Sequence, residues 1–400
     1  MNNAIRRFHP DFPKVLFCVL CYCFAQNILN GVMALHLTSL GHGAVVAGYM
    51  AVAFAIFAII ARLVAGFLSD VVSRRVVLAV GCFIFALFSL LFNFIPIIGL
   101  MIFFRGLQGA GFSSSNTSAS AIFVDLAPPG KLERNMSFLW GSNAVMVGIV
   151  GFFIQFLIRS DRLGDAFTMV AVAMFAACVV SLFVRYEKGL THGKDNTPTE
   201  TNPLPAPRGI SRIIEKKALP AFIVLLFLSI AHAAPGLYIL VYAERMGHTG
   251  MAIPYSLTAA GAMILGNIFC PSITKKWGYQ MPLILVSLLN FAAMAVIAYT
   301  GTPIAFYLMA ASFGILLSIC MPILNTLAVK DLPFHRRGTG SGTVLLALDL
   351  GVGVGGFLFG ALIDQMGFPT MFAIASTFCL GAVILTLALF RKQTSPAVAV

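Results

Sequence analysis

The chain has 400 residues, of which 59% are hydrophobic and only 10% are charged, and its mean hydropathy is +0.94. This apolar content far exceeds what the core of a soluble domain could bury, so the composition excludes a soluble protein and indicates a membrane protein. Because about 20 helical residues cross the hydrocarbon layer, the length allows about a dozen crossings and leaves no room for a large soluble domain.

Hydropathy read along the chain predicts an all-α polytopic fold with twelve membrane-spanning helices. A polar, proline-containing stretch (187–217) follows the sixth helix, and we expect it to be a cytoplasmic linker. It would separate an N-terminal six-helix half (1–186) from a C-terminal six-helix half (218–400). The predicted spans are 15–36, 44–68, 76–94, 97–124, 135–158, 166–186, 218–243, 252–274, 281–300, 303–329, 339–363 and 368–390.

The basic residues predict the orientation, because Lys and Arg accumulate on cytoplasmic loops. With the N-terminus inside, the cytoplasmic segments hold 21 of the 26 Lys and Arg residues, and the outer loops hold three. We therefore expect both termini to be cytoplasmic and the protein to lie in the cytoplasmic (inner) membrane. The same bias accounts for the net charge of +12, so no nucleic-acid partner is expected.

The two predicted halves resemble each other at an offset close to 205 residues. SLGHGA (39–44) parallels RMGHTG (245–250), GIVGFF (148–153) parallels VGGFLF (354–359), and DLAP at 125 parallels DLP at 331. Repeated halves are common in secondary transporters, which place the substrate site near the bilayer midplane where the halves meet.

The segment between the second and third spans reads GFLSDVVSRR (66–75), with an acid and two arginines between very apolar stretches. It resembles the signature of the major facilitator superfamily, although two of its positions depart from the pattern. The resemblance implies a fold of twelve helices in two pseudo-symmetric halves. It also implies close helix contact at the glycine and a cytoplasmic latch in which the arginines pair with an acid on the fourth helix. The latch residues would be Gly66, Asp70, Arg74, Arg75 and Asp125. The alternative is that ordinary topology charges flank a tight turn.

A second resemblance to the superfamily covers RGLQGAG (105–111) on the fourth span. It implies a role in proton coupling for Arg105, with Gln108 one turn further on the same face; the alternative is an arginine that snorkels to the outer surface. An antiporter pattern on the fifth span is only partly present, since 141–153 has its glycines but no proline. The drug:proton antiporter (efflux) type is the most similar branch, and two short stretches resemble exporters of opine-type metallophores such as staphylopine.

Of the 14 acidic residues, only Asp349 lies deep in a predicted span, and Arg62 lies at a comparable depth. In the superfamily the second and eleventh helices pack together, so the resemblance implies that these residues form a pair that opens when Asp349 is protonated. A static pair that only fixes packing is the alternative. Gly351 and Gly355 have the G-x-x-x-G spacing that is typical of close helix packing.

Polar residues on the other spans are candidates for a substrate cavity between the halves. Gln26 and Asn30 share one face of the first helix, and His232 occupies the repeat position of Gln26 on the seventh. Hydrogen bonding between helices is the alternative role for each of them. The predicted cavity residues are Gln26, Asn30, Gln108, Asn116, Asn143, His232, Tyr238 and Asn325.

The sequence lacks the H-E-x-x-H, P-loop and G-x-S-x-G patterns, so we do not expect an enzyme. The eight cysteines fall inside predicted spans and are expected to pack as small hydrophobic residues, so neither a metal nor a cofactor is expected. We predict a monomeric secondary active transporter in the lipid bilayer, with protons as the coupling ion. It would export a small polar or amphipathic organic molecule. Proton-coupled uptake of a nutrient or metallophore, facilitated diffusion, and a receptor or scaffold without transport remain alternatives.

Overall fold

The structure is a computed structural model and describes residues 9–95, 97–126, 132–185, 215–332 and 337–390. The side chains of residues 67, 70, 71, 132–138, 140, 337 and 338 lie outside the description. Of the predicted linker, only residues 215–217 are described.

The described residues form helices and no strand, which confirms the all-helical fold. The 3₁₀ turn η3 leads into α8, and the π-helical turn η4 joins α11 to α12 without a break. The elements are α1 (Phe12–Ser39), α2 (Ala44–Val71), α3 (Arg74–Phe92), α4 (Ile98–Asp125), α5 (Leu132–Arg159), α6 (Asp165–Leu182), η3 (Lys216–Ala218), α8 (Leu219–Arg245), α9 (Ala252–Trp277), α10 (Gln280–Thr300), α11 (Pro303–Ile315), η4 (Leu316–Cys320), α12 (Met321–Val329) and α13 (Arg337–Leu389).

Every predicted span overlaps a helix, and ten helical stretches of the described residues are long and apolar enough to cross a membrane. α4 is not one of the ten, and its second half contains the polar run SSSNTSAS. α13 is counted once although it comprises two helical segments, because the backbone at Gly367 is not helical (φ 81°, ψ 174°). The number of crossings therefore stays a prediction.

The turns after α1 and α8 give the first sequence repeat a structural counterpart. Gly41 and Gly247 have φ of 82° and 75°, a left-handed conformation that glycine adopts without steric cost. One residue later, the backbone N–H of His42 donates to Leu37 O (3.0 Å), and that of His248 donates to Ala243 O (2.9 Å). SLGHGA and RMGHTG thus encode the same helix ending.

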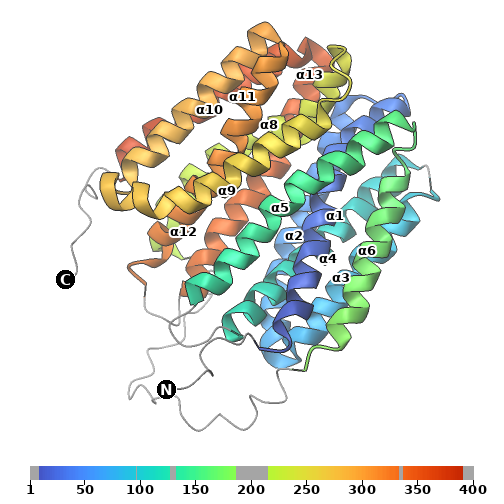
Figure 1. Ribbon diagram of the computed structural model, residues 1–400, viewed down its shortest axis with the longest axis vertical. Coiled ribbons are helices and arrows are strands. Elements are labelled where there is room, and N and C mark those ends of the chain that lie inside the picture. Colours follow the sequence, from blue (N-terminus) through green and yellow to red (C-terminus); the bar gives the residue numbers. More distant parts are fainter. Residues whose placement is uncertain (1–8, 96, 127–131, 186–214, 333–336, 391–400) are drawn as a thin grey trace.

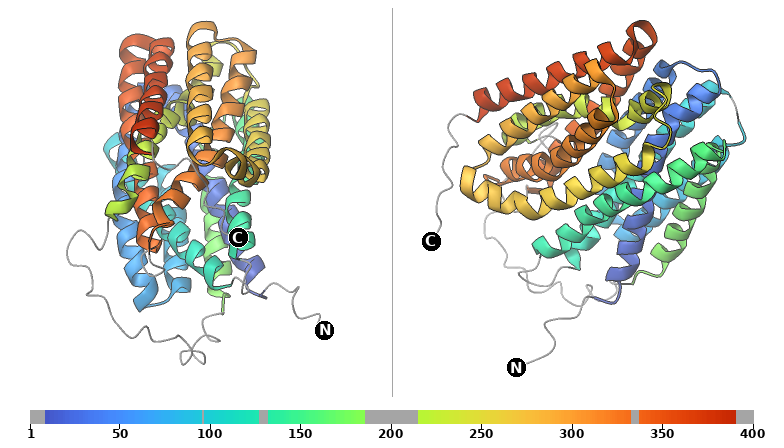
Figure 2. Two further views of the ribbon diagram at one scale, coloured as in Figure 1. Left: turned by 90° about the vertical axis from the view of Figure 1, so that its left-hand side faces the viewer. Right: turned by 45° about the horizontal axis from the view of Figure 1, so that its top comes forward.

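The helices form two groups, α1–α6 and α8–α13 (Figure 1). In the first group α3 packs against α4 and α6, and in the second α13 packs against α8 and α10. The groups meet where α2 packs on α13, α5 on α9 and α1 on α8, and the views in Figure 2 show the same division. We call the end of the bundle where α1 begins the terminal end, and the end where α2 begins the distal end.

Glycines bring α2 and α13 into close contact along the seam between the groups. A Cβ at Gly48 would lie 2.7 Å from the carbonyl oxygen of Gly356. A Cβ at Gly356 would lie 2.6 Å from the Cβ of Ala51, and one at Gly353 would lie 2.6 Å from that of Ala55. Small residues on both helices therefore allow the backbones to approach each other.

The α5–α9 seam repeats this arrangement. A Cβ at Gly148 would lie 3.1 Å from the Cβ of Ala260, and one at Gly151 would lie 2.6 Å from that of Ser256. Gly148 and Gly151 correspond to Gly353 and Gly356 at an offset of 205 residues, and Ala260 and Ser256 correspond to Ala55 and Ala51 at the same offset. The two seams are therefore equivalent in sequence and in packing.

Candidate functional site

Two adjoining cavities lie between the helix groups. The larger, of about 140 Å³, is lined from α1, α5, α8, α9, α11, η4 and α13. The smaller, of about 30 Å³, is lined from α1, α2, α4, α8 and α13. Both are lined by Asn30, Leu237 and Val352, so they are neighbours, and we treat them together as one candidate site. The predicted cavity residues Gln26, Asn30 and His232 line it.

Arg105 lines the smaller cavity and is only 4% exposed. Its Nη1 donates to Gln108 Oε1 (2.9 Å), and its Nη2 donates to Asn30 Oδ1 (3.0 Å). The guanidinium lies over the ring of Phe54, 4.5 Å from the centroid. The arginine thus points into the protein rather than toward the outer surface, and Gln108 serves as its partner.

Amide side chains connect α1 to α5 beside the cavity. Asn27 Nδ2 donates to Asn143 Oδ1 (2.9 Å), and Gln26 Nε2 is 3.4 Å from Asn30 Oδ1. The Oε1 atom of Gln26 is buried and has no hydrogen-bond partner among the described residues. The polar residues of α1 therefore serve both helix packing and the cavity wall.

On the opposite wall, His232 of α8 stacks on Phe313 of α11, with ring centroids 4.1 Å apart. Tyr255 of α9 lines the same cavity and is 7% exposed. Its hydroxyl is buried without a hydrogen-bond partner in the described part of the chain. Tyr255 was not predicted, because a tyrosine near the start of a span is common at membrane interfaces.

The five other predicted cavity residues are not among those that line the two cavities, and one of them, Asn143, is the partner of Asn27 described above. Gln108 Nε2 donates to Phe88 O (3.3 Å) besides accepting from Arg105, and Asn116 Oδ1 accepts from Tyr22 OH (3.3 Å). Tyr238 is fully buried, and its hydroxyl donates to Gly356 O (2.7 Å) across the α8–α13 contact. Asn325 Oδ1 is buried with no partner among the described residues. Gln108, Asn116 and Tyr238 thus make hydrogen bonds between helices.

Arg62 and Asp349 lie next to each other on the α2–α13 seam, toward its terminal end. Arg62 Nη2 donates to Asp349 Oδ2 (2.7 Å), and the two side chains are 8% and 9% exposed. The Nε of Arg62 is buried with no partner in the described residues, so the pair has a single hydrogen bond. Just beyond, Gly351 contacts Ser229 of α8, and a Cβ at Gly355 would lie 2.5 Å from Ile230 O, which confirms close packing in this stretch.

Asp364 holds the distal end of the same seam and was not predicted. Its carboxylate accepts from the backbone N–H groups of Ala44 (2.8 Å) and Val45 (2.9 Å) at the start of α2. A carboxylate is stabilising there, because the first amides of a helix lack partners and carry partial positive charge. No sequence signal pointed to this role, since an acid just after a predicted span is ordinary.

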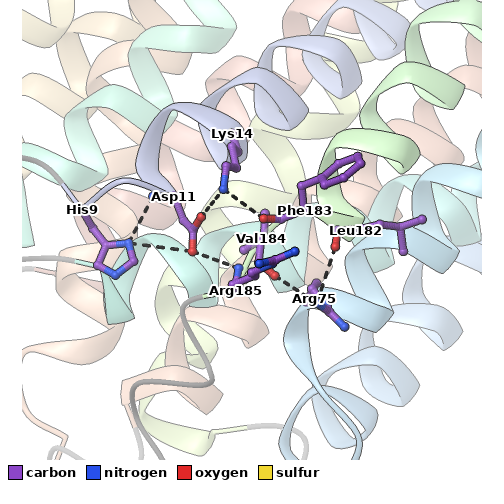
Figure 3. A network of polar contacts seen from close by, with 8 residues as sticks. All are labelled: His9, Asp11, Lys14, Arg75, Leu182, Phe183, Val184 and Arg185. Carbon is purple, nitrogen blue, oxygen red and sulfur yellow. Dashed lines mark hydrogen bonds and ion pairs between the residues drawn. The ribbon is translucent and has the colours of Figure 1, made fainter.

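The predicted latch residues lie at the terminal end of α2, α3 and α4. Arg74 forms an ion pair with Asp125, as expected from the resemblance. Arg75 donates to backbone carbonyls at and just after the end of α6, Leu182 O (3.5 Å) and Val184 O (3.2 Å) (Figure 3). The side chain of Asp70 lies outside the described residues, so its place in a latch stays a prediction.

The expectation of close helix contact at Gly66 is wrong for the described residues. A Cβ there would have no described atom within 4 Å. The close approach on α2 occurs instead at Gly48, near the other end of the helix, where the glycines of α13 provide the space.

Asp11 and Lys14 complete the contacts around the end of α6 (Figure 3). Lys14 Nζ donates to Asp11 Oδ1 (2.6 Å) and to Phe183 O (2.9 Å), and the N–H of Arg185 donates to Asp11 Oδ2 (2.9 Å). Burial raises the pKa of Asp11, but the hydrogen bonds from Lys14 and Arg185 and the charge of Lys14 outweigh it and hold this pKa below its ordinary value. The contacts fix the end of α6 to the start of α1.

Comparisons with known proteins place the chain in a family. The family model described as Major Facilitator Superfamily matches residues 15–356. The chain is 22% identical over 390 residues to the staphylopine export protein of Staphylococcus aureus, covering 96% of each chain. It is 22% identical over 360 residues to an uncharacterised MFS-type transporter of Methanocaldococcus jannaschii, covering 87% of this chain and 89% of the relative.

Solved structures of transporters have the same fold. The nucleoside transporter NupG matches with a TM-score of 0.75 at 12% identity, over 96% of this chain and 100% of that one. A D-xylose–proton symporter matches with a TM-score of 0.71 at 13% identity, over 96% and 97%. At these identities the likeness concerns the fold alone.

Proposed function

The chain belongs to the Major Facilitator Superfamily, and from this premise we propose that it exports a small polar or amphipathic organic molecule in exchange for protons. It would work by alternating access, with the two helix groups rocking about the cavity between them. The staphylopine export protein, which matches over nearly the whole chain, supports export rather than uptake.

The proposed topology has twelve crossings, with both termini in the cytoplasm and the terminal end facing inward. The ten apolar stretches give twelve when α4 is added and α13 is divided at Gly367. The basic residues 74, 75, 275 and 276 lie at the terminal end, which agrees with the positive-inside rule. The two halves, 1–186 and 218–400, and the linker between them (187–217) belong to this proposal, as does a monomeric protein in the cytoplasmic membrane.

The observation that carries proton coupling is the buried pair of Arg62 and Asp349 between the halves. A coupling group must alternate between a charged and a neutral form, and arginine stays protonated, so Asp349 is the proton carrier. Protonation removes its charge, weakens the hydrogen bond from Arg62 and releases the terminal part of the seam. Deprotonation re-forms the pair and draws α2 and α13 together.

The positions of the α5–α9 seam that correspond to Arg62 and Asp349 are uncharged, which supports a specific role for Asp349. The positions 205 residues from Arg62 and Asp349 are Asn267 on α9 and Ala144 on α5. If the charges of Arg62 and Asp349 only helped to join the halves, the equivalent positions of the α5–α9 seam would be expected to carry charges as well. Because a buried ion pair adds little or nothing to stability compared with apolar packing, its presence favours a functional reason.

The experiment is transport into everted membrane vesicles with an imposed pH gradient, acid inside, and a panel of drugs, sugars, amino acids and metallophores. We expect accumulation of an organic substrate that stops when an uncoupler collapses the gradient. Vesicles from cells without the protein are the control. Accumulation that ignores the gradient, or accumulation only in right-side-out vesicles, would contradict proton-coupled export.

A further inference from the structure

Arg105 is a buried cation whose partners are all neutral. Its two hydrogen bonds go to the amide oxygens of Gln108 and Asn30, and its plane covers the ring of Phe54. Within the described ranges no carboxylate lies at ion-pair distance, because the ion pairs there involve other cations. Asp349, the acid deep in the bundle, is already engaged by Arg62.

A buried positive charge of this kind is incompletely balanced. Amide oxygens and an aromatic face lower the cost of burial, but a carboxylate lowers it further through charge-assisted hydrogen bonds. Arg105 lines the smaller cavity, and so does its partner Asn30, which also lines the larger one. An anion in the smaller cavity would therefore meet the guanidinium, and Asn30 lies at the wall of both cavities.

A second group on the far wall also lacks a partner. The buried hydroxyl of Tyr255 makes no hydrogen bond within the described residues, and leaving a buried hydroxyl unpaired is unfavourable. The larger cavity is otherwise lined mostly by apolar residues such as Val150, Ile154 and Leu240, with Asn27, His232 and Ser256 as further polar residues. The two adjoining cavities thus offer a buried cation at the wall of the smaller one and, in the larger one, a mostly apolar wall that includes Tyr255.

We infer that the two adjoining cavities together bind an organic acid, whose carboxylate meets Arg105 and whose apolar body carries a hydrogen-bonding group to Tyr255. This inference names the substrate class of the transporter proposed above and rests on that proposal. It excludes simple cationic drugs as preferred substrates, because a cation beside Arg105 is repelled in a site of low dielectric constant.

The test is a ligand-binding measurement on the purified full chain in detergent, which needs no transport or pH gradient. Thermal unfolding is followed with N-acetylphenylalanine, N-acetyltyrosine and N-acetyltryptophan and with the amide of each, so that every pair differs in charge and not in shape. We expect each acid to raise the unfolding temperature more than its amide. Arg105→Gln should weaken acid binding on the order of 100-fold and abolish the preference. Tyr255→Phe should weaken binding of the acids about fivefold without changing the preference.

Two further variants control the test. Arg105→Lys keeps the charge but loses the planar fork, so it should retain a reduced preference for acids. Arg245→Gln removes a cation that lies over Phe368 outside the cavities, and it should bind the acids like the parent protein. Equal binding of acids and amides by the parent, no shift with any acid, or an unchanged preference in Arg105→Gln would overturn the inference. Gradient-driven transport in vesicles can succeed in each of these cases, so failure here is distinct from failure of the proposed function.

Discussion

The ion pair of Arg62 and Asp349 leaves each charge with one partner in a site that is about nine-tenths buried. Removing one member leaves an uncompensated buried charge, whereas removing both leaves neutral groups of similar size. We therefore expect single and double variants of the pair to differ in how much stability they lose.

Arg62→Ala is expected to destabilise the protein by about 3–5 kcal/mol, and the double variant Arg62→Gln, Asp349→Asn should recover most of the loss. Thermal unfolding in detergent measures both. Arg162→Ala breaks an ion pair with Asp165 whose side chains are 66% and 41% exposed, so it should cost about 1 kcal/mol or less. Equal losses of stability for Arg62→Ala and Arg162→Ala would show that the buried ion pair contributes no more to stability than the exposed one.

Asp11, at the terminal end of the bundle, predicts a pH dependence of stability. Because its pKa is lower in the folded protein, its contribution to stability is present at neutral pH and is lost as the pH falls through the lowered pKa. Asp11→Asn should lower the unfolding temperature at pH 7, and the difference from the parent should shrink in acid. A difference that stays constant from neutral pH to below the ordinary aspartate pKa of about 3.9 would contradict this role.

Helix α13 contacts α2 through two acids that lie 15 residues apart, or about 22 Å along a helix. Asp349 pairs with the side chain of Arg62, and Asp364 accepts from the first amides of α2. The glycines between them set the distance of the two backbones. The seam is thus a continuous helix contact with a polar interaction near each end.

Glycine substitutions test the seam directly. Gly356→Ala would place a methyl group 2.6 Å from the Cβ of Ala51, so the helices must separate, and we expect a lower unfolding temperature and weaker transport. Gly261→Ala on α9 is the matched control, because its Cβ would meet no described atom within 4 Å. There the higher helix propensity of alanine should leave stability unchanged or raise it by up to about 1 kcal/mol. The same loss in both variants would mean that close approach at the seam does not matter.

The arrangement of the two helix groups could be predicted in outline from the sequence. Runs of apolar residues defined each helix, because a membrane helix must hide its backbone and needs a minimum length. The SLGHGA and RMGHTG repeat signalled equivalent turns, and Gly41 and Gly247 have the same conformation. The depth of Asp349 and Arg62 within their predicted spans, together with the family resemblance, was enough to predict that these two residues form a pair.

Other parts of the site depend on three-dimensional contacts that cannot be predicted from the spacing of residues in the sequence. Asp364 follows a predicted span, where an acid is common, and only the neighbouring start of α2 gives it a role. The cavity position of Tyr255 depends on the tilt of α9, and its place in the sequence does not separate it from interfacial tyrosines. Asn116 and Asn325 are polar residues of the expected kind, but neither is among the residues that line the two cavities.

Alternating access requires that contacts on the two sides of the cavity open in turn. Asp364 and Tyr238 join the groups on the distal side, and the pair of Arg62 and Asp349 joins them toward the terminal side. On the distal side the partners of Asp364 and Tyr238 are backbone groups, so neither contact is an ion pair between side chains. Of these contacts, the one toward the terminal side is the ion pair between two side chains, which protonation of Asp349 would abolish, so we assign coupling to that side.

Proton movement driven by substrate in sealed proteoliposomes tests this assignment most directly, with the parent protein and Asp349→Asn compared by a pH-sensitive dye and the substrate found in the vesicle screen. The asparagine mimics the protonated acid, so the variant should exchange substrate down its gradient while moving no protons and should not concentrate it. Parent protein should move protons against the substrate flux. If Asp349→Asn still couples the two fluxes as the parent does, Asp349 is a packing residue and the coupling group lies elsewhere in the chain.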